Sequence, residues 1–434
     1  MIKFSTYNIS YIQDEEYFIF NTISGKIIIL NEKDFNNIFV LKCENEINKY
    51  KEVLFKNHFI VDVDCDENEI ITEKCNYYLN KTLEVTILVT ENCNFKCIYC
   101  YEKHTSGQMS ELVQKSIIKF INNKIDNYNV LRVEWFGGEP LLEIDLIEQL
   151  SNHFLEMCKR KGKGYYAAIT TNAYLLTYDN FRKLKRCRVL SYQITIDGIK
   201  ETHDAQRMLV NGNKTFDIIL NNLLNIKNKS KSRLFEFLIR TNASKFVLPH
   251  ISEYLENMSI LFGDDNRFKF IMTYIKDYGG EKIDNITDIL CSAEDIDYLR
   301  KHSKETDIKR KQERLTHLVN GKYMCYAGNP SSFVFNIKGE CLKCTVGLYE
   351  PNNNVGYLNE EGGLELNYEK FNLWTSGNSK FDKKCNECKL IPLCFERMCP
   401  YMYIRRDSDG QCKLTADSVM REAIEKLKYV ILYD

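Results

Sequence analysis

The sequence predicts an α/β protein built around a partial (β/α)6 TIM-like barrel. From residue 83 onward, six short apolar segments are separated by amphipathic segments of helix length. This alternation is typical of a parallel sheet covered by helices. Six units are fewer than the eight of a closed barrel, so we expect an open barrel with its functional residues at the carboxyl ends of the strands.

The strands and helices of this barrel follow one another at regular intervals. The strands are expected at 85–90, 131–136, 165–171, 189–196, 234–240 and 268–274. The helices between them are expected at 110–126, 143–161, 178–186, 215–228 and 247–261. Each parallel neighbour is then reached through a helical crossover, as parallel pairing requires.

Residues 1–80 have a different pattern and are expected to form a separate module. The expected elements are a hairpin (17–20 and 26–30), two short helices (32–41 and 45–56) and a strand (58–63). Their order suits a winged helix-turn-helix. An acidic stretch begins the linker to the barrel.

The remaining domain boundaries follow from composition. We expect the barrel at 83–290, a charged helical linker at 291–324, a cysteine-rich domain at 325–412 and a closing amphipathic helix at 413–434.

Charge and hydropathy exclude several classes of protein. Lys and Arg number 59 against 60 Asp and Glu, so no basic excess indicates a nucleic-acid partner. The apolar runs are far shorter than the roughly 18 residues of a membrane span, and the first residues do not resemble a secretion signal. We therefore expect a cytoplasmic protein that binds neither nucleic acid nor membrane.

The 17 cysteines indicate metal or cluster ligation, because disulfides are rare in a reducing cytosol. Three lie between 93 and 100, and eight lie between 325 and 412. The other six are expected to be small buried hydrophobic residues: Cys43, Cys65, Cys75, Cys158, Cys187 and Cys291.

The first group, Cys93, Cys97 and Cys100, has the spacing C-x3-C-x2-C and directly follows the first barrel strand. Three thiolates can hold three irons of a [4Fe–4S] cube and leave the fourth iron open to a small molecule, unlike the four-cysteine site of a ferredoxin. A zinc site is the alternative interpretation.

This motif resembles the signature of the radical S-adenosylmethionine superfamily. The resemblance implies that the open iron chelates S-adenosylmethionine. One electron, delivered by a low-potential donor such as flavodoxin or ferredoxin, then yields a 5′-deoxyadenosyl radical that abstracts hydrogen from the substrate. The cofactor carries the chemistry, and the protein positions it.

Further motifs of this family end the second and third strands. Gly137, Gly138 and Glu139 resemble the GGE segment that contacts the methionine amino group, where glycine lets a backbone approach the ligand. Thr171-Asn172 resembles a Thr-Asn-Gly segment, with Ala173 in place of glycine.

The fourth and fifth strands end in matching motifs. Thr195 and Asp197 resemble the S-x-D-G segment, which implies a contact with the ribose. Arg207, in the H-D-x-x-R segment at 203–207, is the implied partner of the methionine carboxylate, because a guanidinium binds carboxylate bidentately. Arg240 and Asn242 are further candidates for cofactor contacts. No catalytic base is identified.

The later cysteines resemble the SPASM extension of peptide-modifying radical enzymes, which implies two auxiliary [4Fe–4S] clusters and three clusters in all. The outer cluster would be bound by Cys385, Cys388, Cys394 and Cys412. The inner cluster would be bound by Cys325, Cys344 and Cys399. Four residues, not the family's three, separate Cys394 from Cys399. A zinc-ribbon-like domain is the alternative.

Cys341 is additional to the SPASM pattern. It could complete the inner cube, or it could be a bystander that leaves one iron free for a substrate thiolate. A strand-like stretch at 332–337 and a turn at 338–339 predict a hairpin, in which the side chains of residues 341 and 344 would point to opposite faces; this favours the bystander.

The three regions together predict a maturase of ribosomally synthesised peptides. The N-terminal module resembles a precursor-peptide recognition module that adds a leader peptide as a β-strand; a structural cap is the alternative. Deleting residues 1–75 is expected to leave uncoupled S-adenosylmethionine cleavage largely intact and to abolish or greatly weaken peptide modification.

Thioether formation, as in sactipeptide and ranthipeptide maturases, is the preferred reaction. Carbon–carbon crosslinking and epimerisation remain open. An anaerobic sulfatase-maturing enzyme is less favoured, because Thr345 follows Cys344 where that family has Asp. A zinc-binding winged-helix regulator is disfavoured by the net charge of −1 and by the strand-end motifs.

Overall fold

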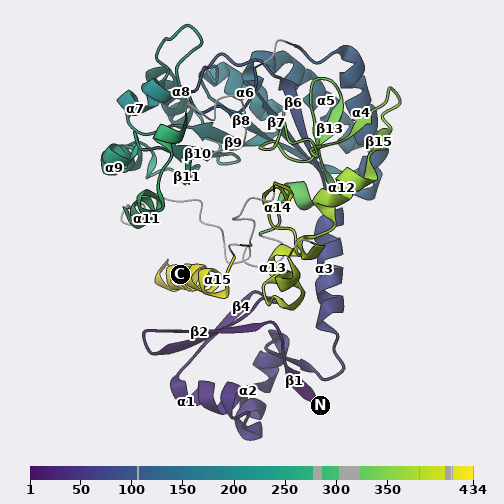
Figure 1. The fold of residues 1–434 in the computed structure, drawn as a ribbon, viewed down its shortest axis with the longest axis vertical. Coiled ribbons are helices and arrows are strands. Elements are labelled where there is room, and N and C mark those ends of the chain that lie inside the picture. Colours follow the sequence, from purple (N-terminus) through teal and green to yellow (C-terminus); the bar gives the residue numbers. More distant parts are fainter. Residues whose placement is uncertain are drawn as a thin grey trace. The chain divides into compact units, whose positions relative to one another are not determined.

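The computed structural model describes residues 1–104, 107–276, 286–302, 323–380, 382–405, 412 and 414–433. The chain divides into two compact units, coloured along the sequence in Figure 1. The barrel unit comprises Thr82–Gln312 and Ser331–Phe371. The terminal unit comprises Met1–Lys81, Glu313–Pro330 and Asn372–Asp434.

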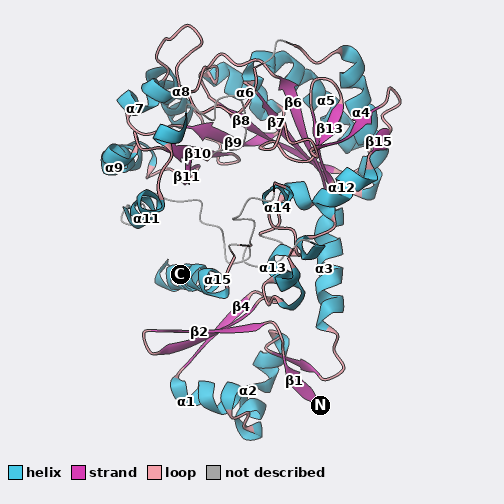
Figure 2. Cartoon of the chain, viewed as in Figure 1, coloured by secondary structure: helices cyan, strands magenta, loops and turns pink. Residues whose placement is uncertain are grey.

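Six parallel strands form the main part of the barrel unit, which confirms the predicted fold class. These strands are β6 (Thr82–Thr90), β7 (Val130–Gly137), β8 (Gly164–Thr171), β9 (Val189–Thr195), β10 (Glu236–Ala243) and β11 (Phe268–Tyr274). They lie side by side in sequence order (Figure 2). All six strands lie where the sequence predicts them.

The predicted helices alternate with these strands. They are α4 (Glu111–Lys124), α5 (Ile144–Arg160), α6 (Tyr178–Arg186), α8 (Phe216–Lys229) and α9 (Ile251–Phe262). A short helix, α7 (Lys200–Gln206), was not expected, because its seven residues carry no apolar stripe. The linker helix begins as α11 (Ala293–His302), and residues 303–322 lie outside the described part of the chain.

The sheet continues beyond β6 into the cysteine-rich region. β12 (Ser332–Phe335) pairs parallel to β6, and β13 (Glu340–Leu342), β14 (Asn354–Leu358) and β15 (Leu364–Leu366) follow as antiparallel strands. The predicted hairpin, with its first strand at 332–337 and its turn at 338–339, is therefore present, and it extends the barrel sheet. The cysteine-rich region is shared between the two units.

The two faces of the barrel sheet differ in polarity. On β7, Trp135 is fully buried and its ring lies 6.3 Å from that of Phe154 on α5. On the opposite face, Arg132 forms ion pairs with Glu84 at 3.5 Å and Glu134 at 3.1 Å. One face therefore packs on helices, and the other presents charged groups.

The terminal unit contains the N-terminal module. A three-stranded sheet consists of β2 (Asn8–Gln13), β3 (Glu16–Asn21) and β4 (Lys26–Leu30), and β1 (Ile2–Phe4) pairs with β5 (Ile60–Asp62). The helices are α1 (Glu32–Phe35), a π-helical turn at Asn36–Val40, and α2 (Glu44–Lys56). The linker expected after residue 64 is a helix, α3 (Glu67–Lys81).

The rest of the terminal unit is short helices and loops. They are α13 (Ile391–Cys394), α14 (Pro400–Ile404) and the closing helix α15 (Ala416–Tyr433). α12 (Tyr368–Thr375) crosses the boundary between the units. Among the described residues, no helix has the length and apolar character needed to cross a membrane.

Candidate functional site

The three clustered cysteines lie on a loop that leaves β6 at Thr90. Cys97 is 8% exposed, and Cys93 and Cys100 are partly buried. The Phe95 amide donates a hydrogen bond to the Cys93 sulfur at 3.3 Å, while burial raises the pKa of the Cys93 thiol. A thiol in such a place is converted to thiolate when a metal binds, because ligation supplies the free energy of deprotonation.

The glycines of the GGE segment fit against the backbone of this loop. The Gly138 amide donates to the Thr90 carbonyl at 3.1 Å, and the Glu139 amide donates to Asn92 at 2.8 Å. A Cβ on Gly137 would lie 2.2 Å from the Thr90 oxygen, and one on Gly138 would lie 2.4 Å from the Asn92 oxygen. The glycines therefore let the end of β7 approach the segment that leads to Cys93, a reason that the sequence argument did not foresee.

The Glu139 side chain is fully buried. Its carboxylate accepts hydrogen bonds from the Thr171 hydroxyl at 2.7 Å, the Asn172 amide at 2.7 Å and the Leu141 amide at 2.9 Å. Burial raises the pKa of Glu139, and these donors oppose that rise. Glu139 thus joins the ends of β7 and β8.

Other contacts fix the cluster loop on both sides. Asn172 donates to the side chain of Asn94 at 2.8 Å. The amides of Lys96 and Ile98 donate to the carbonyls of Met208 and Gln206, at 2.8 and 3.1 Å. The Thr-Asn and H-D-x-x-R motifs are therefore brought together around the cysteines.

Tyr99, between Cys97 and Cys100, connects three of the motif residues. Its hydroxyl donates to Asp197 and accepts from Arg207 at 2.7 Å and from Asn242 at 3.2 Å. Burial raises the pKa of Tyr99, so the phenol stays protonated and can donate. The sequence analysis missed this residue; an aromatic hydroxyl inside the cysteine spacing was the available signal.

Arg207 is the best candidate for an anion-binding residue. It is 7% exposed, and its guanidinium lies 5.6 Å from the ring centroid of Phe95. Its Nε–H has no hydrogen-bond partner among the described residues. A buried donor without a partner costs about 1–3 kcal/mol, so this atom fits a carboxylate that binds beside the cysteines.

Thr195 and Arg240 lie in register on neighbouring strands, β9 and β10. Arg240 donates from Nε to Asn242 at 2.9 Å and to Thr273 at 3.2 Å. These side chains therefore gather at the carboxyl ends of the strands, close to the network of Tyr99 and Asn242.

The four cysteines of the predicted outer site line one pocket in the terminal unit, with a volume of about 130 Å³. These are Cys385, Cys388, Cys394 and Cys412. Burial, with smaller effects of nearby carboxylates and thiols, raises the pKa of Cys385 to about 11. Burial and the neighbouring thiols raise the pKa of Cys394 to about 12. Four cysteines around one hollow form a donor set that fits a cubane cluster.

Within the described residues, no three His, Cys, Asp or Glu side chains are arranged to hold one metal ion. In a [4Fe–4S] cube each thiolate binds a different iron. The absence of such a group therefore concerns sites for a single metal ion and does not count against a [4Fe–4S] cluster.

The predicted inner ligands belong to different units. Cys325 and Cys399 are in the terminal unit, and Cys344 is in the barrel unit. The Cys325 amide donates to the Arg397 carbonyl at 2.7 Å, which fixes Cys325 beside the turn that leads to Cys399.

The Cys344 loop is held by Asn353, which is fully buried. Its Oδ1 accepts from the amides of Lys343 and Cys344 at 3.0 and 2.8 Å, and its Nδ2 donates to the Cys344 carbonyl at 2.8 Å. The Tyr101 hydroxyl donates to the Thr345 carbonyl at 3.1 Å. The residue after Cys100 is thus bonded to the residue after Cys344.

Cys341 is fully buried within β13. It pairs with Phe335, so the two side chains lie on the same face of the sheet. Phe335 packs on Phe120 of α4, with ring centroids 5.0 Å apart. Burial raises the pKa of the Cys341 thiol to about 12. Its surroundings are those of a small core residue.

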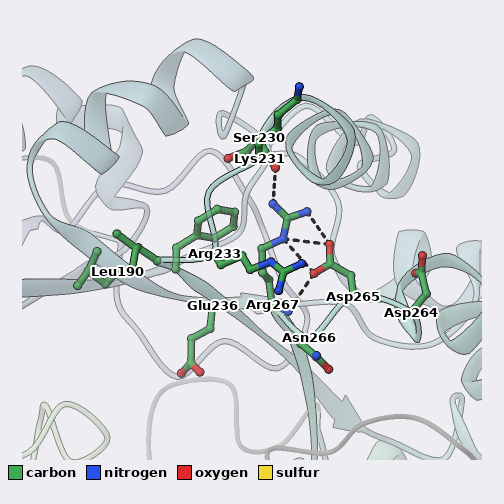
Figure 3. Close-up of a pocket in the computed structure, with 11 residues that line it drawn as sticks. Leu190, Ser230, Lys231, Arg233, Glu236, Asp264, Asp265, Asn266 and Arg267 are labelled. Atoms are coloured by element: carbon green, nitrogen blue, oxygen red, sulfur yellow. Dashed lines mark hydrogen bonds and ion pairs between the residues drawn. The ribbon is translucent and has the colours of Figure 1, made fainter.

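A second hollow, of about 660 Å³, lies at the opposite ends of β9, β10 and β11 (Figure 3). In Figure 3, Arg267 is bonded to Asp265 and to the Ser230 carbonyl. This second hollow contains none of the predicted site residues, so its larger volume does not make it the candidate active site.

An open parallel barrel with three cysteines directly after its first strand is the arrangement expected of a radical S-adenosylmethionine domain. Residues 87–240 match the Radical SAM superfamily, so this chain contains a radical SAM domain.

The chain is 31% identical over 177 residues to an uncharacterised protein of Methanocaldococcus jannaschii, covering 40% of this chain and 57% of that protein. It is 33% identical over 185 residues to the GTP 3′,8-cyclase of Aliarcobacter butzleri, covering 39% and 55%. The chain thus spans about half the length of these two relatives.

Two further likenesses extend beyond the barrel strands. The chain is 24% identical over 331 residues to the cysteine-type anaerobic sulfatase-maturating enzyme of Clostridium novyi, covering 70% of this chain and 84% of that enzyme. The solved structure of native anSMEcpe with bound AdoMet has a TM-score of 0.55 at 19% identity and covers 80% of this chain and 98% of that chain. The second likeness shows a shared fold.

Proposed function

We propose that this protein is a radical SAM maturase that modifies a ribosomally synthesised precursor peptide. The observation that carries the proposal is the cluster loop, on which Tyr99, between two of the three cysteines, bonds to Arg207, an arginine with an unpartnered buried donor. The likeness to anSMEcpe, of which one solved structure holds AdoMet and a peptide, supports a peptide substrate.

Cys93, Cys97 and Cys100 would hold a [4Fe–4S] cluster beside S-adenosylmethionine. When bound, the two supply a 5′-deoxyadenosyl radical that takes a hydrogen atom from the substrate. Arg207 would bind the methionine carboxylate through its free Nε–H.

The motif residues at the strand ends would orient the remainder of the cofactor. Gly137, Gly138 and Glu139 would contact its amino group, most directly through backbone atoms, because the Glu139 carboxylate already accepts three hydrogen bonds. Asp197 and Thr195 would face the ribose, and Arg240 would complete this side of the site.

Two auxiliary clusters would bring the total to three. The outer pocket supplies four thiolates, and Cys325, Cys344 and Cys399 would supply three to the inner cluster. The burial of Cys341 under α4 favours its role as a bystander, which would leave an inner iron free for a substrate thiolate. This arrangement favours thioether formation, and a flavodoxin or ferredoxin would deliver the electron.

The N-terminal module, residues 1–80, would bind the leader peptide by β-strand addition. β2 and β4 are the edges of its three-stranded sheet. Ile9 of β2 and Ile27 of β4 both pack against the core that contains α15 residues, so either edge is a candidate for the added strand.

A second candidate function is sulfatase maturation, favoured by the likeness to the Clostridium novyi enzyme. Sulfatase-maturing enzymes usually carry Asp directly after the equivalent cysteine. In this chain Thr345 follows Cys344, which counts against this function. Carbon–carbon crosslinking and epimerisation remain further alternatives.

The experiment is anaerobic reconstitution, followed by incubation with S-adenosylmethionine, dithionite and a cysteine-containing precursor peptide encoded beside the gene. We expect a peptide that has lost two hydrogens and carries a thioether, together with stoichiometric 5′-deoxyadenosine. Conversion of a sulfatase peptide's cysteine with no reaction of the precursor would support the second candidate and contradict the first.

A further inference from the structure

The outer four-cysteine pocket is built against the N-terminal module inside the terminal unit. Ile9 and Phe20 of the sheet share one core with Leu390, and Cys388 packs against this core. The other buried members are Phe18, Leu393, Val419, Met420, Ala423 and Ile424. Leu390 also lines the pocket, so one side chain forms both the pocket wall and the core of the module.

The turn that follows Cys394 is strained. Phe395 and Glu396 have φ values of +47° and +57°, in the left-handed region that side chains disfavour. Such a conformation persists only where the surroundings impose it.

The N-terminal module supplies much of the apolar surroundings of Phe395, while Asn378 and Ser379 donate hydrogen bonds to Glu396. Phe395 is 5% exposed and packs against Tyr7, Ile23 and Ile71. Its ring also stacks on Tyr78 of α3, with centroids 6.1 Å apart. The module therefore fixes the turn that orients the Cys394 thiol into the pocket.

Hydrogen bonds attach the module to the other ligand-bearing turn. The Thr22 hydroxyl donates to the Lys389 carbonyl at 2.7 Å, and the Lys389 ammonium donates to the Asn8 carbonyl at 3.2 Å. Lys389 directly follows Cys388, so both turns of the pocket contact the N-terminal module.

We propose that the N-terminal module is the scaffold of the outer cluster pocket, so that filling the pocket and folding the module are thermodynamically linked. The inference rests on the proposed function, because it takes the pocket as the cluster site. A group that binds only the assembled pocket stabilises everything that shapes it, and the effect is reciprocal. Deleting residues 1–75 would then remove the outer cluster as well as peptide recognition.

The first test is hydrogen exchange of the full-length protein before and after anaerobic loading with iron and sulfide. We expect slower exchange in β2, β3 and α3 after loading. The double variant Cys385→Ser/Cys388→Ser should lose this protection and keep that of the cluster loop after β6. Equal protection of β2 and β3 in the loaded wild type and the loaded variant would overturn the linkage.

The reverse test uses a matched pair of substitutions, one inside the module and one outside it. Ile23 packs on the Phe395 turn, whereas Ile147 lies on α5 of the barrel unit, outside the module, and both side chains are fully buried. Ile23→Val should speed the release of about four irons to a chelator by about two- to tenfold, and Ile147→Val should not. Equal rates of iron release from both variants would contradict the linkage and leave the proposed function unaffected. A wild type that binds only about four irons would overturn the auxiliary part of the proposed function and the linkage with it.

Discussion

Replacing Tyr99 with Phe removes the one hydroxyl that joins Asp197, Arg207 and Asn242. The ring keeps its volume, so the change is confined to three hydrogen bonds. A buried partner left unsatisfied costs about 1–3 kcal/mol, so three partners predict a loss of at least about 3 kcal/mol. A domain of this size loses about 2–4 °C for each kcal/mol, and we therefore expect the midpoint of the first thermal transition to fall by at least about 6 °C.

The matched control is Tyr192→Phe. Tyr192 is fully buried in the same unit, but its hydroxyl has no hydrogen-bond partner among the described residues. Circular dichroism of the metal-free proteins measures the transition, and calorimetry of the loaded proteins measures the affinity for S-adenosylmethionine. Tyr99→Phe should also weaken that affinity, because Arg207 loses a fixed partner. Equal transitions for the two variants would refute the proposed role of Tyr99.

Three further predictions follow from single residues. Cys341→Ala should keep about 12 irons per chain and most crosslinking activity; loss of about four irons and of crosslinking would show that Cys341 is a ligand. Gly138→Ala should destabilise the barrel unit by about 2–4 kcal/mol in denaturant unfolding, because its Cβ would meet the Asn92 oxygen at 2.4 Å; wild-type stability would refute the close approach. Burial lowers the pKa of His203, so below about pH 6.5 only its unfolded state gains a proton. As the pH decreases below that value, the unfolding free energy of the wild type should fall by about 1.4 kcal/mol per pH unit more than that of the His203→Gln variant. Parallel pH curves for the wild type and the variant would show that His203 is not buried in its neutral form.

The barrel strands were predictable because their signal is local. An apolar run flanked by helices indicates a buried parallel strand wherever it pairs. The pairing of β12 with β6 was not predictable in this way, because it joins residues 332–335 to residues 84–87 across most of the barrel sequence. Sequence spacing gives no measure of such a contact.

Other elements were missed for physical reasons that can be named. β2 and β3 are joined at Asp14 and Glu15, both with positive φ. Tight hairpins usually carry Asn-Gly or Asp-Gly at such positions, so the turn signal was absent. The helical start of α3 was missed because acidic residues, which suit a helix N-terminus, also suit a linker.

The candidate site was predictable by motif, but its internal bonding was not. The motifs locate Glu139, Asp197 and Arg207 at the strand ends, and the structure brings these residues around one loop. That Glu139 bonds to the next strand end, and that Tyr99 connects Asp197 to Arg207, depends on side-chain directions that spacing does not define.

The measurement that tests the central claim most directly is the yield of 5′-deoxyadenosine from S-adenosylmethionine and dithionite. Reconstituted wild-type protein should form it, and Cys93→Ala/Cys97→Ala/Cys100→Ala should form none, because the open iron of the radical cluster beside Arg207 is then lost. Cys158→Ala, which alters a buried cysteine in α5, should behave as the wild type does. Undiminished 5′-deoxyadenosine from the triple variant would contradict the assignment of these cysteines to the radical cluster.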